Sequence, residues 1–156
     1  MSRARIVDGL NGRRLACSTP TGGAFGVHLE LFARGHVVAI PAGVGVAPPE
    51  RRRGAYVVAG HCSYPLRTLE PTGVIEVRAR ALFKLGDFFA IWRQPLSRHQ
   101  LAGFRVSPRT PVRAYVGGRR WRRDIRLIPL ARHAQIVLEA GPYVPPHPSY
   151  GFPPGL

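Results

Sequence analysis

The sequence predicts an α+β fold, a single β-grasp-like domain in which one amphipathic helix covers one face of a mixed sheet. The length of 156 residues suits one domain. The 18 glycines and 16 prolines disfavour long helices and favour short strands joined by turns. The apolar segments follow the order hairpin, strand, helix, hairpin and strand. We therefore expect an irregular N-terminal arm (1–26), the domain (27–141) and a proline-rich C-terminal tail (142–156).

A β-hairpin is predicted at the start of the domain. Residues 1–26 are polar and glycine-rich and indicate an irregular arm. Apolar and polar side chains then alternate over 27–32, and Arg34-Gly35 is a turn signal before a return strand at 36–40. This pattern is typical of two antiparallel strands.

Two shorter strands are predicted between the hairpin and the helix. Tyr56–Ala59 is expected to be a short buried strand, and the arginine triplet at 51–53 is placed in the loop before it. A second strand is expected at 74–77, after a turn at 71–73.

A single helix is predicted over 85–93. Its apolar side chains fall at positions i, i+3, i+4 and i+7 and form one face: Leu85, Phe88, Phe89 and Trp92. Gln94-Pro95 ends the helix, because the residue before a proline avoids the α region. We expect all four side chains of this face to lie in the core.

The second half of the chain supplies the remaining strands. Val112–Val116 is predicted as a strand that turns into a return strand at 119–123, and 125–130 crosses over to a last strand at 135–138. The tail at 142–156 holds six of the 16 prolines. We expect it to be extended and to lie over the domain or a partner.

Charge is the most distinctive feature of the composition. The net charge is +15, from 23 basic and 8 acidic residues, and Lys84 is the only lysine. Arginine-rich codon usage would explain the scarcity of lysine but not the scarcity of acidic residues. Such a charge attracts an acidic protein, a nucleic acid or an anionic membrane surface. Two clusters are the candidates for partner contact: Arg51, Arg52 and Arg53, and Arg119, Arg120, Trp121, Arg122 and Arg123.

No pattern in the sequence indicates an enzyme or a cofactor. No GxSxG elbow surrounds a serine, no glutamate pair has the spacing of a general acid and base, and the short glycine pairs indicate turns. The histidines are scattered, and His61-Cys62 is the only adjacent pair of soft ligands. We expect no bound metal, and the alternative is a site formed by His28, His61 and Cys62.

The compartment stays open at this point. Cys17 and Cys62 form one disulfide if the protein is exported, or remain free thiols in the cytosol. No stretch approaches the roughly 20 apolar residues of a transmembrane helix. Residues 1–14 lack the apolar core of a secretion signal.

Motifs along nearly the whole chain occur together, in this order, in one protein family. They are Val7-Asp8-Gly9, His28-Leu29, Ile40–Val46, Cys62 with Thr68 and Gly73, Leu85–Trp92 with Gln94–Ser97, Val116-Gly117-Gly118, Ile128–Leu130 and Tyr150–Pro153. With them the chain resembles a family of small, poorly characterised prokaryotic proteins that are usually exported or membrane-anchored. The helix motif and the Gln-Pro-Leu-Ser after it are the more specific part.

The resemblance implies a metal site that this chain has lost. The family carries alternate histidines before the first strand, a Cys-x-x-x-x-His-x-His-Asp segment and one more histidine. Here His28 and Cys62 are kept. Four other residues stand where the family favours histidine: Gly26, Arg67, Leu69 and Glu76. Glu70 stands where the family favours aspartate. A soft or borderline metal needs three or four converging ligands, so the site is expected to be degenerate.

Two structural expectations follow from the resemblance. If the family histidines converge on one metal, Arg67 and Glu76 approach each other and form an ion pair, while Leu69 fills part of the cavity. The alternative is that both charged side chains point to solvent. Lys84 stands where the family often has threonine, which removes a helix cap worth about 1 kcal/mol.

Three functional hypotheses remain. The first is a non-catalytic accessory or structural subunit that binds an acidic or membrane-associated protein through its arginine-rich surface. The second is an extracytoplasmic metal-binding protein, and the third is a basic nucleic-acid-binding protein. Loss of the ligand set favours the first over the second. The sequence has no zinc finger, helix-turn-helix or RNA-binding motif, which favours the first over the third.

Overall fold

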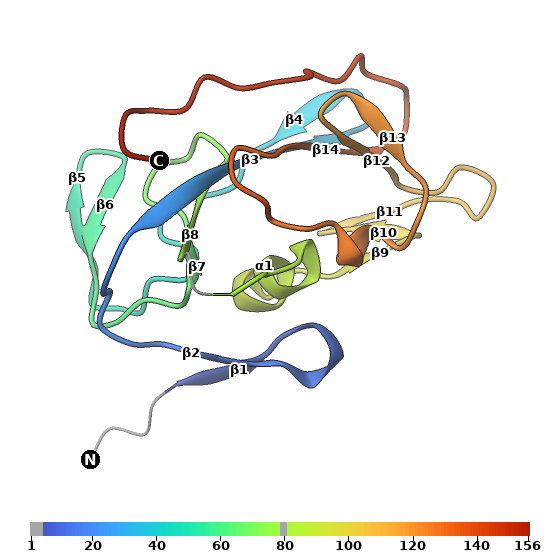
Figure 1. Ribbon diagram of the computed structural model, residues 1–156. Helices are drawn as coiled ribbons and strands as arrows, with labels where there is room; N and C mark the ends of the chain where they lie inside the picture. The colour runs from blue at the N-terminus through green and yellow to red at the C-terminus, as the bar shows by residue number, and fades with distance from the viewer. Residues whose placement is uncertain (1–4, 79–80) are drawn as a thin grey trace.

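The computed structural model describes residues 5–78 and 81–156 (Figure 1). In these ranges the chain forms an α+β fold that is mostly sheet, with a single α-helix, α1 (Leu85–Trp92). Two short 3₁₀ helices, Leu10–Gly12 and Ile125–Leu127, lie before and after it in the chain. Within the described residues, no helix is long and apolar enough to cross a membrane.

A mixed seven-stranded sheet forms the centre of the molecule. Its order is β13-β12-β14-β3-β8-β7, and β4 pairs with the same edge of β3 as β8 does. Only β14 and β3, the two central strands, run parallel. The bounds are β3 Ala24–Ala33, β4 His36–Val38, β7 Leu66–Arg67, β8 Val74–Arg78, β12 Arg113–Val116, β13 Arg119–Trp121 and β14 Gln135–Ala140. The predicted hairpin, the strand after the 71–73 turn and the last strands are all present.

Three small sheets surround the central one. They are β1 (Ile6–Asp8) with β2 (Arg14–Ala16), β5 (Arg51–Arg53) with β6 (Tyr56–Ala59), and the three strands β9 (Leu96–Ser97), β10 (Gln100–Leu101) and β11 (Phe104–Arg105).

Alternation along β3 separates the two faces of the central sheet. Val27, Leu29 and Leu31 are fully buried in the main core, on the side that α1 covers. His28 and Glu30 point to the opposite face, where the tail runs extended across the sheet (Figure 1). The proline content of the tail predicted this extended course.

Helix α1 packs on the sheet through the predicted apolar face. Leu85, Phe88 and Phe89 are buried, and Phe88 has no exposed surface. Trp92 differs from expectation, because it is only partly buried while its ring contacts those of Phe88 and Phe89. The helix also ends one residue earlier than predicted, since Arg93 adopts a left-handed conformation with φ of +60°.

Asp87 replaces the cap that Lys84 cannot supply. Its carboxylate accepts a hydrogen bond from the backbone N–H of Lys84 at 2.9 Å and another from Leu10 at 2.8 Å. The first bond satisfies a free donor at the start of the helix. The second joins the helix to the N-terminal hairpin, although Asp87 is only 1% exposed.

Replacing Asp87 should therefore loosen the helix start and the hairpin together. We expect Asp87→Ala to lower the free energy of unfolding by about 2–3 kcal/mol, because two partly buried N–H donors lose a charged acceptor. Urea unfolding measures this loss. Asp8→Ala, at an exposed carboxylate on β1, is the matched control and should change stability by less than about 0.5 kcal/mol. Equal effects of the two substitutions would contradict the capping interaction.

The structure corrects three expectations in the N-terminal half. The arm at 1–26 is not irregular over its described part, because it contains the β1–β2 hairpin, and β3 begins at Ala24 rather than at residue 27. The arginine triplet at 51–53 is a strand rather than a loop, since it pairs with β6. In β6 only Val57 is fully buried, whereas its neighbours Tyr56 and Val58 are exposed.

Candidate functional site

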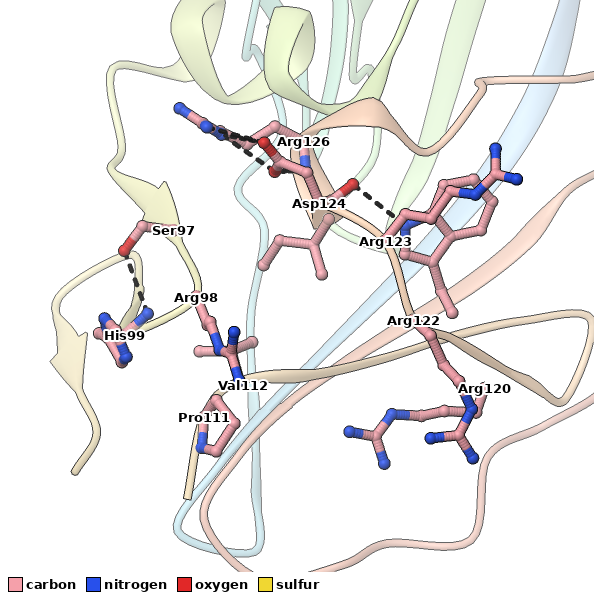
Figure 2. A pocket seen from close by; sticks show the side chains of 12 residues that line it. Ser97, Arg98, His99, Pro111, Val112, Arg120, Arg122, Arg123, Asp124 and Arg126 are labelled. Atoms are coloured by element: carbon pink, nitrogen blue, oxygen red, sulfur yellow. Dashed lines mark hydrogen bonds and ion pairs between the residues drawn. The ribbon is translucent and has the colours of Figure 1, made fainter. Parts of the chain in front are cut away.

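An open pocket of about 640 Å³ lies where β13, the second 3₁₀ helix and the β9–β10 turn meet (Figure 2). Five arginines line it, and we call it the arginine pocket. Its lining residues are Ser97, Arg98, His99, Pro111, Val112, Arg120, Trp121, Arg122, Arg123, Asp124, Ile125 and Arg126. Three of the predicted partner-contact arginines therefore share one concave surface.

The β12–β13 hairpin positions the arginines of this pocket. Gly117 and Gly118 have φ values of +58° and +80°, which a tight two-residue turn between twisted strands requires. β13 is the edge strand, where charged side chains also discourage pairing with another sheet. Successive side chains alternate, so Arg120 lies opposite Tyr115 while Trp121 lies opposite Ala114 on the core side.

Trp121 is a structural residue of the pocket wall. Its indole packs partly buried against the main core. Its Nε1–H donates a hydrogen bond to the backbone oxygen of Asp124 at 3.0 Å. The ring is therefore held by the fold and does not stand free among the guanidinium groups.

The pocket contains one carboxylate, and that carboxylate is already paired. Arg126 donates to both oxygens of Asp124, with Nη2 at 2.7 Å from Oδ2 and Nε at 3.1 Å from Oδ1. The hydrogen bonds from Arg126 lower the pKa of Asp124, and those to Asp124 raise the pKa of Arg126.

The remaining four arginines of the pocket have no acidic partner within the described chain. None of the ion pairs found in 5–78 and 81–156 involves Arg98, Arg120, Arg122 or Arg123. All four residues are exposed. Their positive charge is therefore available to an anionic group that enters the pocket.

The predicted partner-contact residues do not form one surface. Arg51, Arg52 and Arg53 lie on β5, at the opposite end of the molecule from β13 (Figure 1). They are exposed, and Arg52 pairs with Glu50 at 2.8 Å. Arg119 is exposed on β13 but does not line the pocket.

Sequence reasoning missed Arg98 and Arg126. Neither belongs to a run of arginines, and Arg98 comes from a turn before β12 that tertiary packing brings to the pocket. The pairing of β9 with β10 places Arg98 at the pocket, and these two-residue strands give no periodic pattern in the sequence.

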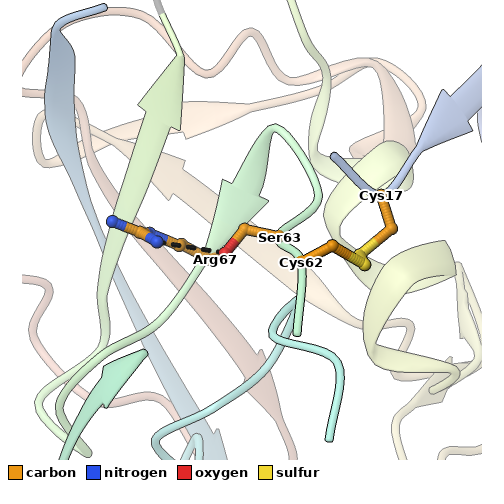
Figure 3. The surroundings of a disulfide bond; sticks show 4 residues. All are labelled: Cys17, Cys62, Ser63 and Arg67. Carbon is orange, nitrogen blue, oxygen red and sulfur yellow. Dashed lines mark hydrogen bonds between the residues drawn. A yellow bond between two sulfur atoms is a disulfide. The ribbon is translucent and has the colours of Figure 1, made fainter. Parts of the chain in front are cut away.

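Two of the three residues of the alternative metal site, Cys62 and His28, have other partners in this structure. Cys62 is bonded to Cys17 in a disulfide, so its sulfur is not a free thiolate ligand (Figure 3). His28 is buried, and its Nδ1 lies 2.6 Å from Gln135 Oε1 and its Nε2 2.9 Å from the Thr72 carbonyl oxygen. Among the residues that the structure describes, no three or more His, Cys, Asp or Glu are grouped to hold a metal ion.

The predicted ion pair between Arg67 and Glu76 is present. Arg67 Nε lies 3.4 Å from Glu76 Oε2, which confirms the predicted approach of these side chains. Strand pairing places Gly26, Glu76 and Arg67 in one row across β3, β8 and β7. Leu69 lines a neighbouring cavity of about 300 Å³ together with Glu76.

No family model matches the sequence, no curated protein is significantly similar to it, and no solved structure matches the fold. The resemblance described above therefore stays a prediction.

Proposed function

We propose that this protein is a non-catalytic accessory or structural subunit that binds an acidic protein partner through the arginine pocket. The observation that carries the proposal is the ratio of charges in this concave surface. Five guanidinium groups line it, and its single carboxylate is held by one of them. Guanidinium groups bind carboxylates bidentately, so a partner's Asp and Glu side chains complement the other four arginines.

A protein partner fits these features better than a nucleic acid does. The indole of Trp121 is packed against the core and hydrogen-bonded, so it is not free to stack on a bound base. A nucleic-acid strand would also follow a continuous basic stripe, whereas the two arginine clusters lie at opposite ends of the molecule.

We propose further that the fold is a variant of the β-grasp. A hairpin (β3–β4), a helix and a later strand parallel to the first are the ordered elements of that architecture. The parallel pair β3–β14, with antiparallel β12 beside β14, supports this assignment. The variation is that β4 and β8 share the outer edge of β3.

The proposed compartment is extracytoplasmic or membrane-associated. We also propose that the chain is a member of the family that it resembles, and that the metal site of the family is degenerate in this chain. The Cys17–Cys62 disulfide supports an oxidising compartment. The convergence of Gly26, Arg67 and Glu76 on one face supports a shared origin of the site.

Charge reversal in the pocket tests the proposed function. The probe is a fluorescent oligo-glutamate peptide, with binding followed by anisotropy at fixed salt. We expect Arg120→Glu/Arg122→Glu to weaken binding by at least about tenfold, because two guanidinium groups of the pocket become carboxylates. Arg51→Glu/Arg53→Glu removes the same charge from β5 and should change the affinity by less than about threefold.

Two outcomes would contradict the proposal. Equal weakening by the two double variants would show that only net charge matters. Tighter binding of single-stranded DNA than of oligo-glutamate, with a steep salt dependence that both variants reduce alike, would indicate a nucleic-acid-binding protein.

A further inference from the structure

The tail crosses the sheet without joining it. No residue of the tail pairs with a strand in the part of the chain that the structure describes. Its backbone is held at few points: the N–H of Val144 donates to Glu139 Oε1 at 3.1 Å, and the carbonyl of Leu156 contacts the ring of His133. Side chains therefore provide most of the attachment.

Two aromatic side chains of the tail stack on histidine rings of the domain. The rings of Tyr150 and His28 are parallel, with centroids 3.6 Å apart, and those of Phe152 and His133 are 4.4 Å apart. Gly26 makes room for Phe152, because a Cβ at that position would lie 2.6 Å from the ring. The platform under Tyr150 is rigid, since His28 is 5% exposed and hydrogen-bonded at both nitrogens.

The rest of the tail fits the sheet at three more places. His147 Nδ1 lies 2.9 Å from Glu30 Oε1. Pro148 packs over the turn at Gly118. Val144 packs against a second apolar cluster, formed by Phe32, Tyr115 and Val137. The face thus offers an apolar patch, a carboxylate and a pair of ring platforms in a row.

This arrangement resembles a known mode of peptide recognition, with the difference that aromatic side chains of the tail, and not its prolines, stack on rings of the domain. Extended proline-rich segments dock on grooves lined by aromatic rings, and their prolines reduce the conformational entropy lost on binding. The tail is extended and proline-rich like such a ligand, and the face beneath it presents two rings and an apolar cluster. We propose that this face is a recognition surface for an extended proline-rich segment of a partner protein. The segment carries two aromatic side chains that are separated by one residue, as Tyr150 and Phe152 are in the tail. The tail is then the resident occupant of this surface.

The tail can leave without unfolding of the domain. Tyr150 and Phe152 are only partly buried, and most of the tail is exposed. Opening breaks the two ring stacks, the contact between His147 and Glu30, the hydrogen bond from Val144 to Glu139 and the apolar packing of Val144, but no pair of strands. Segments held by few buried contacts open at a free energy far below that of global unfolding.

A labelled peptide with the sequence of residues 142–156 is the probe. It is titrated against three full-length chains: the native protein, Tyr150→Ala/Phe152→Ala, and Ser149→Ala as a control at an exposed residue of the same tail. We expect the double variant to bind the peptide at least about tenfold more tightly than the native chain, because its own tail no longer covers the recognition surface. Ser149→Ala should bind the peptide like the native chain.

The peptide supplies the second control. The same peptide with alanine for Tyr150 and Phe152 should lose its binding to the double variant. Binding of the labelled peptide to the double variant no tighter than to the native chain would overturn the proposal, as would equal binding of the alanine peptide. Dimers of the native chain that vanish in the double variant would also overturn it, because a second copy would then be the occupant.

Discussion

Phe88→Ala should lower the free energy of unfolding by about 3–5 kcal/mol, the cost of removing a large buried aromatic side chain and leaving a cavity. Phe88 has no exposed surface, and its ring lies edge-on to Phe89 with centroids 6.0 Å apart. Urea unfolding with the disulfide intact measures the loss.

Two comparisons make this prediction specific to the packing of α1. Trp92→Ala should cost less, because that ring lies at the margin of the core and is partly exposed. Leu82→Ala, at a residue that is 58% exposed, should change stability by less than about 0.5 kcal/mol. A loss below about 1 kcal/mol for Phe88→Ala would show that the helix does not cover the sheet.

Elements with a local periodic pattern could be predicted from the sequence. The helix follows from four apolar residues at helical spacing and a proline stop, and the β3–β4 hairpin follows from alternation around Arg34-Gly35. The short strands β9, β10 and β11 could not be predicted, because two residues contain no period. The β1–β2 hairpin was missed because tertiary contacts hold it.

The candidate site was predictable only where its residues are contiguous. Arg120, Arg122 and Arg123 stand out as a run, whereas Arg98 and Arg126 join them through folding. The separation of Arg51–Arg53 from that run depends on the strand order, which composition does not contain. The Arg67–Glu76 pair was expected only through the hypothesis that the histidines of the resembled family converge on one metal.

The N-terminal hairpin shows how distant contacts replace local signals. Two strands of three residues are not stable alone in water. The Asp87 carboxylate holds the turn of this hairpin through Leu10, and the disulfide follows its second strand at Cys17. Leu15, between them, is only 2% exposed and belongs to the main core. Both attachments lie outside the hairpin's own sequence.

Removing the disulfide should destabilise the protein by about 4 kcal/mol, because cross-linking residues 45 positions apart restricts the unfolded chain. The measurement is urea unfolding of Cys17→Ala/Cys62→Ala. Hydrogen exchange should also become faster in 6–16, since the Ser18–Ser63 bridge beside the disulfide loses its covalent support.

The control for the disulfide is Ser18→Ala, next to Cys17. This exposed residue pairs with Ser63 through its backbone, so losing the hydroxyl should change stability by less than about 0.5 kcal/mol. Reduction of the native chain should reproduce the loss seen in the double variant, because both treatments open the same loop. If the double variant is destabilised by less than about 1 kcal/mol, the hairpin is held by Asp87 and the core contact of Leu15 alone. Unchanged exchange in 6–16 together with the full loss of stability would place the whole effect in the unfolded state.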